Sequence, residues 1–375
     1  MALLDAGGFF GAADESQSSL EDQIRGDYLV DAMSTLSYDA VNLGGQDVRF
    51  GEDFLTYHLS DVTFPVVSSN LQNADGSPYV ATTTRFERGG YSVGVVGVLD
   101  DADAAQVAAE SDAAGEPLQV AAMADAAASA VAEVASADLV VLLAFMAPAD
   151  AEMLAMGLPD VDVVVHAGGN LQPSAATELG SQFAVGTGYD GKWVVRLDLD
   201  EDGGAWSQRS SFVVSMDGAW PDDPEMDAHY QAYLAELAEA ADEIVAGIEQ
   251  EVPAGGSYVG SDTCAVCHPS QTEQWQTTPH SHAFETLVET NHDYSPSCYA
   301  CHTVGFGFVG GFLLPEDTPE RMDVGCESCH GAGEEHVAAP GPGWGLEPTD
   351  QCLGCHTPED SPQFDMGTYL PQVVH

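Results

Sequence analysis

Four short stretches of the sequence repeat one arrangement of two cysteines and a histidine. Each stretch has a cysteine, two other residues, a second cysteine and then a histidine. The four pentads are "CAVCH" at 264–268, "CYACH" at 298–302, "CESCH" at 326–330 and "CLGCH" at 352–356, and they use all eight cysteines of the chain. From the chain's own frequencies of Cys and His, chance predicts roughly 0.005 such pentads. The pattern therefore has a chemical cause.

A Cys-x-x-Cys pair can be a disulfide redox centre, half of a zinc site or an attachment site for haem. Zinc does not need a histidine beside every pair, and a redox disulfide occurs once, at the start of a helix, rather than four times. Covalent haem uses every element, because both thiols add to the porphyrin vinyl groups and the next residue supplies the proximal ligand of the iron. The pentads therefore predict four c-type haems. The attachment residues are Cys264, Cys267, Cys298, Cys301, Cys326, Cys329, Cys352 and Cys355, and the proximal ligands are His268, His302, His330 and His356.

Five further histidines of the same region are candidates for the opposite face of each iron. They are His280, His282, His292, His336 and His375. A second imidazole makes a six-coordinate iron that transfers electrons, whereas an iron without one can bind a small molecule. We expect His280, His336 and His375 to be distal ligands and keep His282 as a further candidate. One five-coordinate haem remains an alternative.

The composition excludes several kinds of partner. There are 61 Asp and Glu against eight Lys and Arg, which gives a formal net charge of −53. Such a surface repels nucleic acid and acidic lipid. It is typical of proteins adapted to high salt, and it would also attract a cationic redox partner. No apolar run approaches the roughly 18 residues of a membrane helix, so we expect no transmembrane segment.

The chain divides into three regions. In residues 1–221, continuous apolar strand-like runs alternate with helical stretches, which predicts an α/β domain with a sheet covered on both faces. Residues 222–256 form an acidic spacer helix followed by a linker rich in Gly and Pro. Residues 257–375 contain every cysteine but few apolar runs. We predict a mainly α, loop-rich multihaem domain whose core is supplied by the cofactors.

The last region resembles a known family. Residues 258–375 are similar to the tetrahaem cytochromes c that accept electrons in hydroxylamine oxidation, and the flanks "TPHSHAFETL" and "GCESCHGAGEEH" match as well as the pentads. The resemblance implies helical wrapping, haem pairs in stacked and tilted contacts, and a mixture of bis-His and five-coordinate iron. It also implies distal ligands at His280, His336 and His375.

The first region resembles calcineurin-like metallophosphoesterases of the 5′-nucleotidase type, through "LLDAGGFF", "YDAVNLGGQDVRFG" and "DVDVVVHAGGN". Those enzymes hold two metal ions with Asp, Asn and His. The corresponding positions of this chain lack these residues: Gly8 replaces the bridging Asp, Gly45 and Gln46 replace Asn-His, Phe145 replaces a His, and Gly168 and Asn170 replace two more. A two-metal site cannot work without its ligands. We therefore expect a degenerate metallophosphoesterase-like domain that serves as a scaffold or docking surface.

These observations favour a c-type cytochrome that passes single electrons along four haems to or from a redox partner protein or an extracellular acceptor. Attachment of c-type haem requires export, which predicts a periplasmic or extracellular location. The N-terminus shows no secretory signal, so we expect a mature or truncated form. One alternative is a haem-based reductase or oxidase of a small nitrogen or sulfur compound. Another is a subunit of a polymeric electron-conducting assembly, either a homo-oligomer or a larger cytochrome complex.

Overall fold

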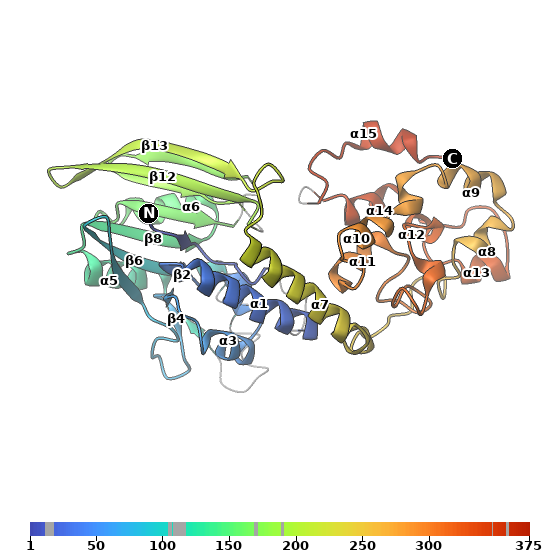
Figure 1. The fold of residues 1–375 in the computed structure, drawn as a ribbon, viewed down its shortest axis with the longest axis horizontal. Coiled ribbons are helices and arrows are strands. Elements are labelled where there is room, and N and C mark those ends of the chain that lie inside the picture. Colours follow the sequence, from blue (N-terminus) through green and yellow to red (C-terminus); the bar gives the residue numbers. More distant parts are fainter. Residues whose placement is uncertain are drawn as a thin grey trace. The chain divides into compact units, whose positions relative to one another are not determined.

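The computed structural model divides into two compact units (Figure 1). It describes residues 1–11, 19–103, 107, 118–168, 172–188, 191–346, 348–357 and 360–375. The N-terminal unit comprises Met1–Ser18 and Arg25–His229, and the C-terminal unit comprises Ser19–Ile24 and Tyr230–His375. The division falls within the acidic helix α7 (Pro224–Ala246), most of which is therefore grouped with the C-terminal unit.

A six-stranded sheet with the order β10-β11-β9-β8-β6-β5 forms the centre of the N-terminal unit. Its four inner strands are parallel: β6 (Tyr91–Leu99), β8 (Leu139–Phe145), β9 (Val163–Ala167) and β11 (Gln182–Gly186). The edge strands β5 (Thr83–Arg88) and β10 (Ser174–Leu179) are antiparallel to their neighbours. The inner strands are almost continuous runs of buried Val and Leu, as expected for parallel strands that are covered on both faces.

Two layers cover this sheet. On one face, Val96 and Leu142 pack with residues of helices α5 (Met123–Val134) and α6 (Pro148–Met156). On the other face, Val95 and Leu143 pack with the hairpin of β12 (Trp193–Asp202) and β13 (Ala205–Ser215), which lies along the sheet in Figure 1. The unit is therefore an α/β sandwich.

The rest of the N-terminal unit supports the loops discussed below. A small parallel sheet consists of β1 (Leu4–Asp5), β2 (Ala40–Asn42) and β3 (Val66–Val67), and β4 (Leu71–Gln72) pairs with β7 (Gln119–Val120). The associated helices are α1 (Leu20–Leu36), α2 (Gly45–Val48), α3 (Glu52–Leu59) and the short η1 (Asp101–Asp103).

Short helices and loops build the C-terminal unit. They are α8 (Ser261–Ala265), α9 (Pro269–Trp275), η2 (Pro279–His282), α10 (Glu285–Glu289), α11 (Pro296–His302), η3 (Pro319–Arg321), α12 (Cys326–His330), α13 (Glu334–Ala338), α14 (Pro348–Cys355), α15 (Met366–Tyr369) and η4 (Leu370–Gln372). Each pentad lies on or directly beside one of these helices. The cluster of buried apolar side chains is small and comprises Ala241, Phe284, Leu287, Tyr299, Phe312 and Leu314. The unit therefore has the helical, loop-rich character that the sequence predicts.

Within the described residues, no helix combines the length and the apolar character needed to cross a membrane.

Candidate functional site

Three predicted distal histidines lie beside three predicted proximal ones in the C-terminal unit. The ring centres are 6.3 Å apart for His268 and His336, 6.1 Å for His280 and His356, and 5.8 Å for His330 and His375. A metal that binds two imidazoles at about 2 Å on opposite sides holds their ring centres about 6 Å apart. The three pairs therefore have the spacing of bis-His iron sites.

The electrostatic environment of these pairs suits metal ligation. Burial lowers the pKa of His280, and the neighbouring His356 lowers it further. Burial likewise lowers the pKa of His330, with smaller contributions from His375 and His268. Neutral imidazole is the form that binds a metal. The residues present thus fit an iron held between two imidazoles.

The fourth predicted proximal ligand, His302, has a different environment. Its Nδ1 donates a hydrogen bond to the carbonyl of Ala283 at 2.7 Å, which leaves Nε2 as the metal-binding nitrogen. Among the described residues, no second histidine ring pairs with His302. The side chain of His282 is 60% exposed and lies 3.8 Å from Glu285. The structure therefore does not bring His282 to a predicted proximal histidine.

His292 is also engaged away from the predicted proximal ligands. Its Nε2 is 2.6 Å from the hydroxyl of Tyr230, and its Nδ1 is 2.9 Å from Oγ1 of Thr290. Neither of the two remaining candidates is thus placed opposite His302, and the second pentad differs from the other three.

The thiols show which pentads are neighbours. A hydrogen bond between the thiols of Cys264 and Cys326 raises the pKa of Cys264 and lowers that of Cys326. The first and third pentads are therefore adjacent. A second hydrogen bond, with Cys355, lowers the pKa of Cys301, so the second and fourth pentads are adjacent as well.

The third and fourth pentads are also close to each other. Burial raises the pKa of Cys329, and the thiol of Cys352 raises it further. Helix α12 packs against both α8 and α14, and α11 packs against α14. The attachment sites thus follow one another in the order first, third, fourth, second, which differs from their order in the sequence.

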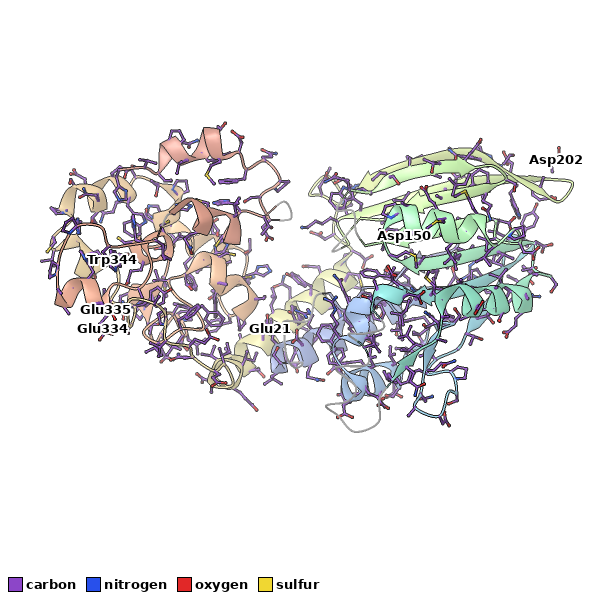
Figure 2. The ribbon with its side chains drawn as sticks, turned by 180° about the vertical axis from the view of Figure 1, so that it is seen from behind. Glu21, Asp150, Asp202, Glu334, Glu335 and Trp344 are labelled. Carbon is purple, nitrogen blue, oxygen red and sulfur yellow. The ribbon has the colours of Figure 1, made fainter. Side chains whose placement is uncertain are left out.

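Two aromatic rings stack on predicted iron ligands. Trp344, labelled in Figure 2, lies 4.7 Å from His336 with the ring planes at 18°. Phe364 lies 4.3 Å from His356 at 6°. Stacked rings restrict rotation of the imidazoles and so hold them in one orientation. Phe364 was missed in the sequence analysis, where no spacing rule connects an aromatic residue with a histidine eight positions earlier.

In the N-terminal unit, the ring of Phe145 lies between the loops that contain Gly8, Gly44 and Gly168. A Cβ atom at Gly8 would overlap the ring of Phe145, and one at Gly44 would come within 2.6 Å of it. Gly168 adopts a φ of +88° and lies against the same ring. Asn170 lies outside the described residues. Within the described residues, no group of three or more His, Cys, Asp or Glu is arranged to hold a metal ion.

A buried carboxylate ties these loops together. The side chain of Asp47 accepts hydrogen bonds from the backbone N–H groups of Gly8, Phe10 and Gly44 at 2.7, 3.0 and 2.8 Å. Burial raises the pKa of Asp47 to about 7, against the opposing effect of these hydrogen bonds. Burial also raises the pKa of Asp5 to about 6. The carboxylate of Asp47 therefore has a structural role, because its hydrogen bonds hold the loop of Gly8 and Phe10 against the loop of Gly44.

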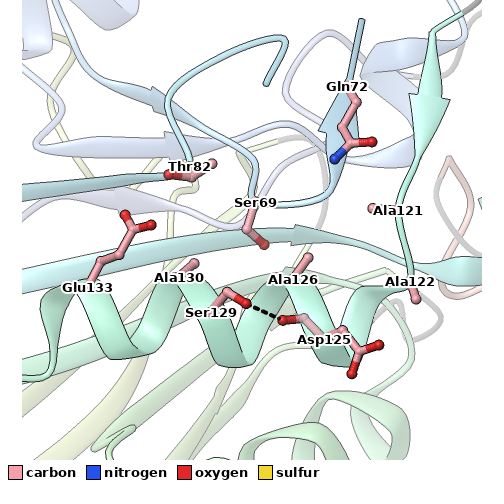
Figure 3. Close-up of a pocket in the computed structure, with 10 residues that line it drawn as sticks. All are labelled: Ser69, Gln72, Thr82, Ala121, Ala122, Asp125, Ala126, Ser129, Ala130 and Glu133. Atoms are coloured by element: carbon pink, nitrogen blue, oxygen red, sulfur yellow. Dashed lines mark hydrogen bonds between the residues drawn. The ribbon is translucent and has the colours of Figure 1, made fainter. Parts of the chain in front are cut away.

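A groove of about 400 Å³ lies elsewhere in the N-terminal unit, along α5 (Figure 3). Its polar lining residues are Ser69, Gln72, Thr82, Asp125, Ser129 and Glu133. The hydroxyl of Ser129 donates a hydrogen bond to the backbone carbonyl of Asp125 at 2.9 Å. The groove shares no lining residue with the loops around Phe145.

Comparison with known proteins agrees with both resemblances. Residues 263–331, which contain the first three pentads, match the family described as cytochrome c554 and c-prime. The chain is 33% identical over 99 residues to cytochrome c-554 of Nitrosomonas europaea. The aligned segment covers 22% of this chain and 42% of that protein. This chain thus spans less than half the length of that relative.

Solved phosphoesterase structures share the fold of the N-terminal unit. The sulfate thiohydrolase SoxB of Thermus thermophilus, in complex with glycerol, has a TM-score of 0.53 at 21% identity and covers 64% of this chain and 43% of its own. A 5′-nucleotidase precursor of the same species has a TM-score of 0.52 at 22% identity, and the match covers 70% of this chain and 53% of that one. The NAD nucleotidase of Haemophilus influenzae has a TM-score of 0.54 at 14% identity, and the match covers 69% of this chain and 55% of that one.

The fold class predicted from the sequence is confirmed. The chain combines a metallophosphoesterase-like α/β unit with a helical unit of the c-type cytochrome kind. Within that class, the helical unit resembles cytochrome c554 in particular, which supports a role for c-type haem in electron transfer.

Proposed function

We propose that the protein is a tetrahaem c-type cytochrome that passes single electrons along a chain of covalently bound haems. The observation that carries the proposal is the set of three histidine pairs, each of which joins a pentad histidine to a second imidazole at 5.8–6.3 Å. No disulfide joins any two of the eight cysteines, and all of them lie in pentads, so the pentads account for every cysteine as a haem-attachment residue.

The residues of the chain hold, orient and tune the cofactors. Haem supplies reversible one-electron chemistry at iron. The pentad thiols would hold each porphyrin, and the three histidine pairs would supply imidazole ligands to three of the irons. Nδ1 of His302 is bound to the carbonyl of Ala283, and Nδ1 of His356 is 2.9 Å from Oγ of Ser361. The carbonyl can only accept, so it fixes the tautomer of His302 and leaves Nε2 available to bind a metal, whereas the Ser361 hydroxyl orients the ring of His356.

The packing of the helices that carry the pentads supports an order of electron transfer. Helix α12 of the third pentad packs against α8 of the first and α14 of the fourth, and α14 packs against α11 of the second. We infer that electrons pass between the haems in the order first, third, fourth, second.

A second candidate function concerns the haem of the second pentad. Because no imidazole is placed opposite His302 among the described residues, this iron is the candidate for a five-coordinate site that binds a small molecule. Such a site would suit a reductase or oxidase of a small nitrogen or sulfur compound.

The number of open irons can be measured with carbon monoxide. In the dithionite-reduced holoprotein we expect one molecule of carbon monoxide to bind per four haems, because three irons have two imidazole ligands. A spectroscopic titration against the haem content gives this ratio, and the ferric protein, which does not bind carbon monoxide, is the control. Binding of none would remove the open site, and a purified protein with the mass of the bare polypeptide would refute the cytochrome itself.

The N-terminal unit is, we propose, a phosphoesterase-like fold without hydrolytic activity. The ring of Phe145 lies where a side chain at Gly8 would have to project, the carboxylate of Asp103 lies where one at Gly45 would, and Asp47 is bound by three backbone N–H groups. Without ligands, no ion can clamp the attacking and leaving oxygens.

This proposal predicts no metal-dependent hydrolysis. Nucleoside monophosphates incubated with the protein and excess Mn²⁺ or Zn²⁺ should release phosphate at the rate of the metal-only blank. An active 5′-nucleotidase assayed in parallel is the positive control. Phosphate release that rises with protein concentration and is abolished by EDTA would contradict the proposal.

The partner and the location follow from the same chemistry. Covalent haem attachment places the protein in the periplasm or on the cell exterior. A net charge of −53 favours a cationic redox protein as partner and disfavours nucleic acid. An extracellular electron acceptor, or assembly into a homo-oligomer or a larger cytochrome complex, is the alternative.

A further inference from the structure

Glu327, the second residue of the third pentad, carries an ionisable side chain in a buried position. It is only 2% exposed, a degree of burial that glutamate rarely reaches without partners. Its carboxylate accepts hydrogen bonds from the backbone N–H groups of Val259 at 2.9 Å, Gly260 at 2.6 Å and Gly333 at 2.8 Å. All the contacts found for this carboxylate are with donors, which is the environment that stabilises an ionised carboxylate.

In the part of the chain that the structure describes, no ion pair balances this charge. None of the ion pairs found there includes Glu327. Backbone N–H groups stabilise a carboxylate through their dipoles but do not cancel its net charge. The interior of the C-terminal unit therefore contains a negative charge that solvent does not screen.

This charge belongs to the third pentad and also lies close to the first pentad. It acts electrostatically on the thiols of both Cys264 and Cys326. Gly260 connects the two regions directly, since its N–H binds Glu327 while its carbonyl is 3.5 Å from Sγ of Cys264. Val259 and Gly260 precede the first pentad, whereas Gly333 follows the third. A single carboxylate thus lies close to two attachment sites.

We propose that Glu327 sets the reduction potentials of the haems on the first and third pentads, which it lowers relative to those on the second and fourth. A nearby negative charge favours ferric over ferrous iron, and the interaction is stronger in the interior than at the solvent-screened surface. The inference rests on the proposed function. It gives the haem series a direction, because electrons on the first and third haems are then driven toward the fourth and second.

The experiment is a redox titration of holoprotein carrying Glu327→Gln, with each low-spin haem followed by electron paramagnetic resonance. We expect the equilibrium constant for reduction to rise about tenfold for two of the four haems, which is about 59 mV for a one-electron couple. The matched control is Glu335→Gln, which removes the same charge at an exposed position of the same unit (Figure 2). This control should change the equilibrium constant for reduction of every haem by less than about twofold, because solvent screens that site.

Each outcome decides the matter. Unchanged potentials in Glu327→Gln, or equal shifts in both variants, would overturn the inference while leaving four haems in place. If Glu327→Gln does not assemble with four haems, Glu327→Asp decides instead, because it retains the charge. Equilibrium constants for reduction within about twofold of those of the parent protein would then support the role of charge, and a change of about tenfold in these constants would overturn it. Parent protein without covalent haem would refute the proposed function itself.

Discussion

Replacement of both cysteines of the third pentad by serine should give a protein with three haems in which the first haem no longer exchanges electrons rapidly with the fourth. Helix α12, which contains Cys326 and Cys329, packs against α8, which contains Cys264, and against α14, which contains Cys352. The third pentad is therefore the connection between two ends of the series. Serine cannot form the thioether bonds, so this haem and its redox step are both lost.

Mass spectrometry should show the loss of one haem, and flash photoreduction should show the loss of the fast phase of electron redistribution among the haems. The matched control replaces Cys352 and Cys355, which also removes one haem. That variant should keep fast exchange between the first and third haems, because the link through Cys264 and Cys326 is intact. Fast redistribution across all remaining haems in the third-pentad variant would show that the series runs along another path.

Replacement of His336 by alanine should convert the first haem from a low-spin to a high-spin iron. His336 faces His268 at 6.3 Å between ring centres and is stacked against Trp344. Alanine leaves the iron with one imidazole, and the face formerly covered becomes open to ligands. The number of carbon monoxide molecules bound by the reduced protein should rise from one to two per chain.

Added imidazole should restore the low-spin spectrum of His336→Ala, which separates loss of the ligand from loss of the fold. His282→Ala is the control, because the side chain of His282 is 60% exposed and is not paired with a pentad histidine. It should leave the spectrum and the carbon monoxide ratio unchanged. A high-spin signal in His282→Ala, or its absence in His336→Ala, would require the distal ligands to be reassigned.

The pentads could be predicted from the sequence because haem attachment is encoded within five consecutive residues. The three histidines that we expect to be distal ligands, His280, His336 and His375, lie beside pentad histidines in the structure, and their role as ligands stays a prediction. Which histidine pairs with which pentad was not accessible, because the pairs join segments far apart in the sequence. His280 and His282 illustrate the difficulty: both lie in the turn η2, but only the three-dimensional path of that turn directs one inward.

The N-terminal unit shows a similar limit. The α/β fold predicted from the apolar strands is confirmed, whereas the loss of metal ligands at Gly8, Gly45 and Phe145 stays a prediction from the sequence. That the ring of Phe145 lies against Gly8, Gly44 and Gly168 depends on how three loops come together, which no local pattern encodes. Glu327 was equally hidden, because one acidic residue among 61 gives no sign that it is buried.

The two units differ in what they need in order to fold. The N-terminal unit has extended apolar clusters on both faces of its sheet, so its own side chains are sufficient to drive collapse. Among the described residues of the C-terminal unit, the buried apolar side chains form one small cluster around Tyr299 and Phe312, which is little for more than 100 residues. If the proposed haems are present, they add the apolar surface that this unit lacks, so we expect its polypeptide to fold only after the haems are attached.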